Sequence, residues 1–150
     1  MLHKYYTRFI RPYMNKSTIS KSFNTLFFDF LDDIITIYPE NTNIKIAKEK
    51  FDFIRKANTT ILIKFWKIHV YDCYSNQINQ GDINFFLEKD YSADLNKDTG
   101  VDKGFSNDKI LSMIENVRET IRDMDDVNRA HSAKYIMNLS KLSEMYATAT

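Results

Sequence analysis

The sequence of 150 residues contains only one cysteine, two prolines and three glycines. A single thiol cannot build a disulfide framework or a cysteine-rich zinc module, and it suits a reducing compartment. The few glycines and prolines exclude collagen-like and linker-like chains and disfavour a turn-dense all-β fold. No run of 18 apolar residues is present, so the sequence predicts no transmembrane helix. Hydrophobic residues at 43% are enough for the core of one domain.

The formal net charge of +1 hides an uneven distribution along the chain. Residues 1–28 carry five basic side chains and no acidic one, whereas residues 82–126 carry twelve acidic and six basic side chains. The first segment also lacks the continuous apolar stretch of a secretory signal peptide. We therefore expect an intracellular protein with a basic arm and an acidic middle segment.

Apolar residues recur at steps of three and four in the first half of the chain, which predicts helices. Ser17 or Thr18 can cap a first helix. This helix should end at Tyr38, because the residue before a proline, here Pro39, avoids the helical region. Its predicted buried stripe is Ile19, Phe23, Leu26, Phe27, Phe30, Leu31, Ile34 and Tyr38. Asn41 or Thr42 can cap a second helix that buries Ile44, Ala47, Phe51 and Ile54 and fades at 57–58.

A third helix is expected from Thr59 or Thr60 toward Gln80, with Gly81 as its C-terminal stop. Its apolar positions extend most of the way round, which predicts the central and most buried helix of the fold. They are Ile61, Leu62, Phe65, Trp66, Ile68, Val70, Cys73 and Tyr74. Alternation at residues 61–65 also allows a strand, but the length of the apolar region favours a helix.

The second half of the chain contains a weaker helical pattern. Asp82 can cap a short helix over 82–90, and Ser106 or Asn107 can cap a longer helix that buries Ile110, Ile114, Val117, Ile121 and Met124. The pattern falters at 123–126, and a last segment comes after it with Ala130, Ala133, Ile136 or Met137, Leu139, Leu142 and Tyr146. Whether these last two segments are separate helices or one kinked helix stays open. The fold class predicted is an all-α, single-domain bundle of five or six helices over 17–147, preceded by a basic aromatic N-terminal arm over 1–16.

One loop resembles the calcium loop of an EF-hand. Asp94, Asn96, Asp98 and Asp102 fall at positions 1, 3, 5 and 9 of that pattern. The glycine required at position 6 is Thr99, and the bidentate glutamate required at position 12 is Phe105. Asp, Asn and Gly also favour turns without any metal. The interpretation favoured is a turn-rich loop without a cofactor, and the alternative is a weak Ca²⁺ site.

The N-terminal arm interleaves basic and aromatic side chains: Lys4, Tyr5, Tyr6, Arg8, Phe9, Arg11 and Tyr13. Aromatic stacking combined with cationic phosphate contacts holds single-stranded nucleic acid. The same residues can dock on a protein partner or rest at a membrane surface. Because no recognised nucleic-acid motif comes after the arm, the favoured interpretation is an arm that packs on this protein or on a partner protein. Nucleic acid is the first alternative and a membrane surface the second.

No catalytic constellation is evident in the sequence. His69 and Cys73 are four residues apart and would share one face of a helix, but no third ligand or orienting acid completes a metal site or a nucleophilic pair. The acidic groups at 29–33 and 123–126 suit solvated helix faces, and no glycine-rich phosphate loop is present. We therefore expect a protein that is not an enzyme.

Three segments together resemble a group of short helical proteins from nucleocytoplasmic large DNA viruses, the giant viruses of the mimivirus and phycodnavirus type. They are the FFDFLDDIITIYPE stretch that ends at 40, GDINFFLEKDYSADL at 81–95, and residues 117–146. The matching residues are Tyr38-Pro39, Asn58, Phe85-Phe86, Asp90-Tyr91, Asn128, Tyr135 and Leu139. This chain departs from the group in having Thr59 after Asn58 and no tryptophan near Thr120.

The resemblance implies a virus-encoded helical protein that acts by binding other molecules. It assigns a functional role to no residue of this chain. The abundance of isoleucine, lysine and asparagine, which AT-rich codons encode, agrees with such an origin. The predicted function is a non-enzymatic interaction or structural protein, either a virion component or an adaptor in the viral factory. For a viral protein the expected location is the host cytoplasm or the virion. The alternative is a nucleic-acid-associated or regulatory protein that uses the basic arm. The oligomeric state is left open.

Overall fold

The structure of the protein is a computed structural model that describes residues 15–82, 84, 87 and 107–149, and every regular element in these ranges is helical. The predicted all-α fold is confirmed for this part of the chain. Residues 1–14 of the predicted basic arm lie outside the described residues, and its last two residues, Asn15 and Lys16, belong to the start of α2. The elements are α2 (Lys16–Ile37), α3 (Thr42–Ala57), α4 (Ile61–Trp66), the π-helix η2 (Lys67–Tyr71), α5 (Asp72–Asn79), α7 (Asn107–Arg122) and α8 (Asp126–Thr148).

Helices α2 and α3 begin at asparagine caps. The Asn15 side chain accepts a hydrogen bond from the Thr18 amide at 2.9 Å, so α2 starts ahead of the predicted Ser17 or Thr18 cap. Asn41 caps α3 through the Ile44 amide at 3.2 Å, as predicted. The predicted buried face of α3 is confirmed at Ile44, Ala47, Phe51 and Ile54.

The third predicted helix is interrupted. α4 buries nearly every side chain, as expected of the central helix, but the backbone widens into the π-helix η2 and Tyr74 then leaves the helical region at φ −139°. A π-turn accommodates an extra residue and shifts the register of the helix beyond it. Cys73 is therefore exposed rather than on the buried face. Gly81, at φ +78°, ends this segment as predicted.

The C-terminal segments are two separate helices, which answers the question that the sequence left open. α7 ends at Arg122, and Asp125 then caps α8 through the Asn128 amide at 2.8 Å. The predicted buried positions of α7, from Ile110 to Met124, are all buried. The buried face of α8 differs from the prediction, because it combines Ile136 and Leu139 with three serines, Ser132, Ser140 and Ser143.

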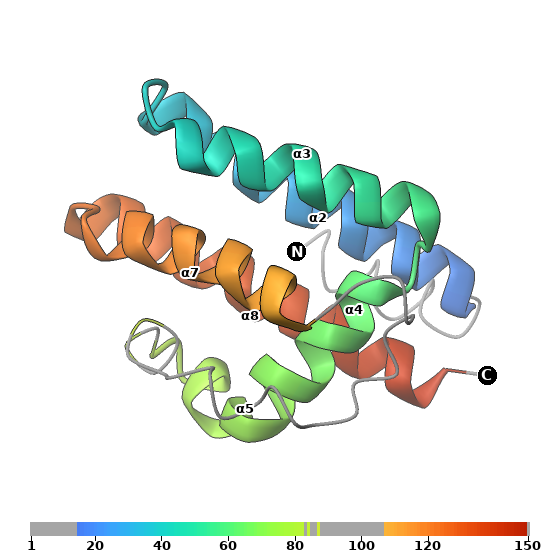
Figure 1. Cartoon of the computed structure of the whole chain (residues 1–150). Coiled ribbons are helices and arrows are strands. Elements are labelled where there is room, and N and C mark those ends of the chain that lie inside the picture. Colours follow the sequence, from blue (N-terminus) through green and yellow to red (C-terminus); the bar gives the residue numbers. More distant parts are fainter. Residues whose placement is uncertain (1–14, 83, 85–86, 88–106, 150) are drawn as a thin grey trace.

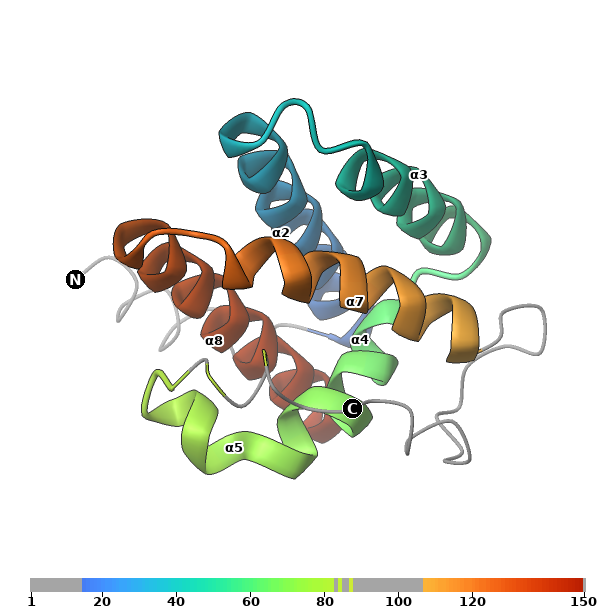
Figure 2. The same ribbon diagram turned by 60° about the vertical axis from the view of Figure 1, so that its left-hand side comes forward.

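The helices form a bundle around an aromatic centre. α2 and α8 share the most extensive contact between two separate helices of the described part, and α3 packs against α2, α4 and α7. Figure 1 and Figure 2 show α3 along the outer edge beside α2, with α7 and α8 on the other side and α4 to α5 across one end. Rings of Phe27 and Phe51 meet edge to face at 4.9 Å, and Trp66 meets Phe23 at 6.0 Å.

Candidate functional site

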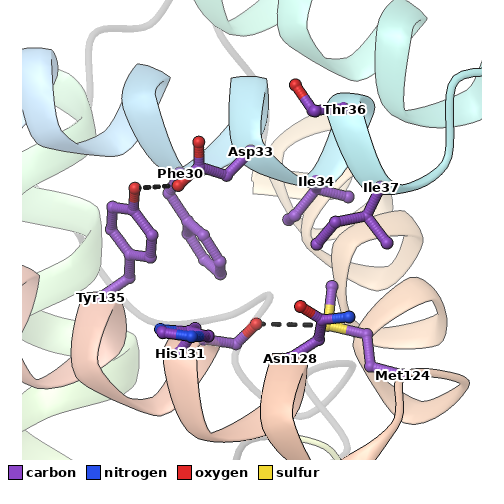
Figure 3. Close-up of a pocket in the computed structure, with 10 residues that line it drawn as sticks. Phe30, Asp33, Ile34, Thr36, Ile37, Met124, Asn128, His131 and Tyr135 are labelled. Atoms are coloured by element: carbon purple, nitrogen blue, oxygen red, sulfur yellow. Dashed lines mark hydrogen bonds between the residues drawn. The ribbon is translucent and has the colours of Figure 1, made fainter.

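A pocket of about 280 Å³ opens between the second half of α2 and the first half of α8 (Figure 3). Its apolar lining comes from Phe30, Ile34 and Met124, which are buried, and from Ile37, which is 39% exposed. Its polar lining comes from Asp33, Thr36, Asn128, His131, Ser132 and Tyr135. An exposed isoleucine above a buried apolar floor is the kind of surface that takes up an apolar group from outside.

Helical spacing explains how both sides of the pocket arise. On α2 the lining positions 30, 33, 34 and 37 are separated by steps of three and four, so they share one face. On α8 the lining positions 128, 131, 132 and 135 are also one, three or four residues apart, so they share one face of that helix. Met124 adds a flexible thioether from the joint between α7 and α8. The pocket therefore belongs to the α2–α8 interface, where each helix contributes one stripe.

One wall of the pocket is built by Tyr135. Its ring stacks on Phe30, with centroids 4.8 Å apart and planes at 20°. Its hydroxyl donates a hydrogen bond to Oδ2 of Asp33 (Figure 3). Burial of the ring, together with the neighbouring carboxylates of Asp33 and Asp29, raises the pKa of Tyr135 to about 12. Tyr135 is therefore a neutral donor at physiological pH, and Asp33 keeps a fixed place at the rim.

The opposite end of the pocket contains hydroxyl, amide and imidazole groups. The Ser132 hydroxyl donates a hydrogen bond to the sulfur of Met124 at 3.3 Å, and the Asn128 side chain donates one to Oδ2 of Asp125 at 3.4 Å. His131 is exposed at the rim. Serine, histidine and aspartate side chains thus all line one pocket. However, Ser132 is hydrogen-bonded to Met124, and Asp33 is hydrogen-bonded to Tyr135. These bonds hold the wall and the floor rather than aligning a nucleophile with a base.

The residues that the sequence singled out fall elsewhere or outside the described part. The arm residues Lys4 to Tyr13 and the loop residues Asp94 to Asp102 lie outside it, so both remain predictions. The shared face predicted for His69 and Cys73 is wrong. His69 is fully buried with its ring 4.4 Å from that of Phe65, whereas Cys73 is exposed, because the π-turn changes the register between them.

Two further findings concern the described part of the chain alone. Within residues 15–82 and 107–149, with 84 and 87, no three His, Cys, Asp or Glu side chains gather as metal ligands. No helix in these ranges combines the length and hydrophobicity needed to cross a bilayer. The acidic residues Asp29, Asp32 and Asp33 are exposed, as predicted for a solvated face.

The pocket itself is not predicted by the sequence. Asp33 is expected there only as a solvated carboxylate, and Tyr135 only as one matching residue of the viral resemblance. The available signal is modest: Ile37 lies three residues after Ile34 and extends the apolar stripe of α2 to its end. The partner stripe on α8 is mostly polar, so no periodicity points to it.

The part of the chain that the structure describes is an all-helical bundle with an open pocket at a helix–helix interface. In sequence the chain is similar to an uncharacterised protein of Acanthamoeba polyphaga mimivirus, with 28% identity over 145 aligned residues. The alignment covers 77% of this chain and 18% of that protein, so the chain spans less than a fifth of its relative. No family model and no solved structure matches the chain.

Proposed function

We propose that the chain is a non-enzymatic protein-interaction module of a giant virus, acting as an adaptor or a virion component. The α2–α8 pocket is the surface through which it holds its partner. The observation that carries the proposal is the exposed side chain of Ile37 above the buried Phe30, Ile34 and Met124. The similarity to a mimivirus protein supports the viral setting, and the much greater length of that protein suits a module.

The dimensions and chemistry of the pocket favour a side chain over a metabolite. Its volume of about 280 Å³ lies below the roughly 300–1,000 Å³ typical of small-ligand sites. An apolar anchor from a partner helix would contact Ile34, Ile37 and Met124, because such grooves take up helix side chains spaced by three and four residues. The carboxylate of Asp33 at the rim favours a neighbouring basic residue or hydrogen-bond donor on the partner.

The test compares wild-type protein with Ile37→Arg in the cells where the protein is naturally made. Ile46→Arg on α3 is the matched control, since Ile46 is 47% exposed and Ile37 is 39% exposed. Affinity capture with quantitative mass spectrometry should recover a partner with wild type and Ile46→Arg that Ile37→Arg loses. Reconstitution of that partner with the purified full chain, measured by calorimetry, should show the same loss.

Two results would contradict the proposal. One is a partner set that does not change in the Ile37→Arg variant, which would place the interaction elsewhere. The other is turnover of a small substrate by the purified chain that Ile37→Arg abolishes. Mass spectrometry of purified particles then separates the two forms of the proposal, because a virion component is abundant in the particle and an adaptor is absent from it.

A further inference from the structure

The open side of the α2–α8 pocket has two rims, one from each helix. Asp33 of α2 and His131 of α8 line the pocket and are exposed, so they mark this side. Residues three or four apart share one face of a helix. Asp29 therefore continues the α2 rim, and Val127 and Lys134 continue the α8 rim. These three side chains are exposed as well.

Helices α2 and α8 run antiparallel, which fixes the level of each rim residue along the pocket. Lys16 at the start of α2 lies 5.0 Å from the ring centroid of Tyr146 near the end of α8. Asp33 is level with Tyr135, its hydrogen-bond partner. Ile37 lies at the end of the pocket where α8 begins (Figure 3). Charged and apolar rim residues are therefore separated along the length of the pocket.

The two rims differ in charge and share an apolar end. The α2 rim carries the carboxylates of Asp33 and, one turn away, Asp29, whereas the α8 rim carries the ammonium group of Lys134, next to the tyrosine that is level with Asp33. At the apolar end, Ile37 is 39% exposed and Val127 is 68% exposed. We call Asp29 and Asp33 the acidic rim and Lys134 the basic rim. The open side is therefore complementary in charge to a rotated copy of itself.

We propose that a second copy of this chain occupies the α2–α8 pocket, with the acidic rim of each copy against the basic rim of the other. The inference rests on the proposed function, because it names the partner held at the same pocket. A two-fold axis parallel to the helices places α2 of one copy over α8 of the other. The carboxylates of Asp29 and Asp33 then face Lys134 of the second copy. Ile37 faces Val127 of the second copy at the apolar end.

Charge favours this arrangement over other occupants of the pocket. A two-fold axis across the helices would place α2 on α2, so the acidic rims of both copies would repel each other. A uniformly basic helix from another protein would be attracted by the acidic rim and repelled by Lys134, and a uniformly acidic helix would meet the reverse. A second copy presents both signs in the required order. Because only the pocket halves of two helices take part, we expect weak, salt-sensitive association.

Sedimentation equilibrium of the purified full chain over a concentration series tests the proposal. Wild type should pass from monomer to dimer at low ionic strength, and added salt should weaken the dimer. Lys134→Glu should weaken self-association by about tenfold, because both rims are then acidic. Asp29→Lys combined with Asp33→Asn should weaken it by about tenfold too, because both rims are then basic, while the amide oxygen at position 33 still accepts from Tyr135.

Mixing the two rim variants provides the decisive measurement. The variant with two basic rims and the variant with two acidic rims are complementary at both contacts, so the mixture should form a heterodimer that neither variant forms alone. Lys50→Glu on α3 is the matched control for Lys134→Glu, because both lysines are exposed on a helix. It should dimerise like wild type, and circular dichroism should show all variants folded.

Three results would overturn the inference. A chain that stays monomeric at every concentration is the first. If Ile37→Arg then still loses a captured protein of another sequence, the proposed function stands without this inference. Dimerisation that is unchanged in Ile37→Arg and in both rim variants is the second, because it assigns the self-contact to another surface. The third is a mixture of rim variants that does not associate, which contradicts the pairing of opposite rims.

Discussion

Tyr135 of α8 donates its phenolic hydrogen to the carboxylate of Asp33 on α2, across 102 residues of sequence. The same ring stacks on Phe30, so one side chain ties two helices by a polar and an aromatic contact. These contacts form the wall of the pocket and connect the helices that pack most extensively on each other. The integrity of the candidate site is therefore coupled to the stability of the α2–α8 interface.

The Tyr135→Phe variant isolates the polar half of this contact. It keeps the stacking on Phe30 and removes the hydroxyl, so we expect a loss of about 1 kcal/mol in the free energy of unfolding. Urea denaturation at neutral pH measures this loss. The exposed Lys141→Ala on the same helix is the control and should leave stability almost unchanged. A loss as small as that of the control would show that the bond adds nothing to the fold.

The same tyrosine predicts a pH dependence at the alkaline end. Folding raises the pKa of Tyr135 from 10.0 to about 12, so the folded state favours the protonated phenol. Its contribution to stability is present below pH 10 and is lost as the pH rises from 10 to 12. Wild type should lose more stability than Tyr135→Phe over this window in urea titrations. Parallel losses would contradict the assignment. Glu144 beside Tyr71 also raises a tyrosine pKa, and that contribution is common to both proteins.

A third prediction concerns the serine-lined face of α8. The indole nitrogen of Trp66 donates to the hydroxyl of Ser140 at 2.9 Å inside the core. Ser140→Ala removes this acceptor while it improves helix propensity, so the two effects oppose each other. The lost bond should dominate, with a net destabilisation of about 1 kcal/mol in thermal or urea unfolding. A stabilised variant would mean that propensity outweighs the bond.

The cap of α3, the stop at Gly81 and the buried faces of α3 and α7 were predictable because their signals are local. Asn41 precedes apolar residues at steps of three and four, so both the cap and the buried face can be derived from a window of 16 residues. The apolar spacing from Ile110 to Met124 locates α7 in the same way. Gly81 marks the end of α5 because a left-handed φ favours glycine.

The π-helix and the buried serines were not predictable from the same window. Lys67–Tyr71 contains no proline or glycine, and its apolar residues point in several directions, so the sequence does not mark the extra residue in the turn. Ser132 and Ser140 are small polar residues that are ordinarily exposed. Both are buried here, and their hydrogen-bond partners Met124 and Trp66 lie outside α8.

The pocket is the least predictable feature because it depends on tertiary packing alone. Asp33 and Tyr135 have no local relationship, and each belongs to a helix face that by itself indicates solvent. Only the register between α2 and α8 brings them together.

Gly81 offers a test of backbone strain. Its φ of +78° is a conformation that other residues adopt at a cost, although a Cβ there would meet only the sulfur of Met137 at 3.9 Å. Gly81→Ala should therefore destabilise the protein by about 1 kcal/mol through the backbone rather than through a clash. Gly81→Asn should lose less, because asparagine tolerates this region better. Equal losses for the two variants would point to a steric cause.

Two arginines of α7 donate hydrogen bonds to the same backbone oxygen but differ in burial. Comparing them separates the effect of burial on stability from the effect of the hydrogen bond. Arg118 and Arg122 both donate to the carbonyl of Leu87, at 2.7 Å and 2.9 Å. The Arg118 side chain is only 4% exposed, whereas that of Arg122 is 41% exposed. Arg118→Ala removes a buried guanidinium and its packed stem, and we expect a loss of about 2–3 kcal/mol in the free energy of unfolding.

Arg122→Ala is the matched comparison for this pair. It should lose less than about 1 kcal/mol, since water can replace an exposed guanidinium and Arg118 still holds the carbonyl. Urea unfolding of the two single variants and of the double variant measures both losses and their coupling. Equal losses for the single variants would show that the shared carbonyl, rather than the burial of Arg118, determines the stability of this contact. A double variant that loses more than the sum would show that either arginine can hold Leu87 alone.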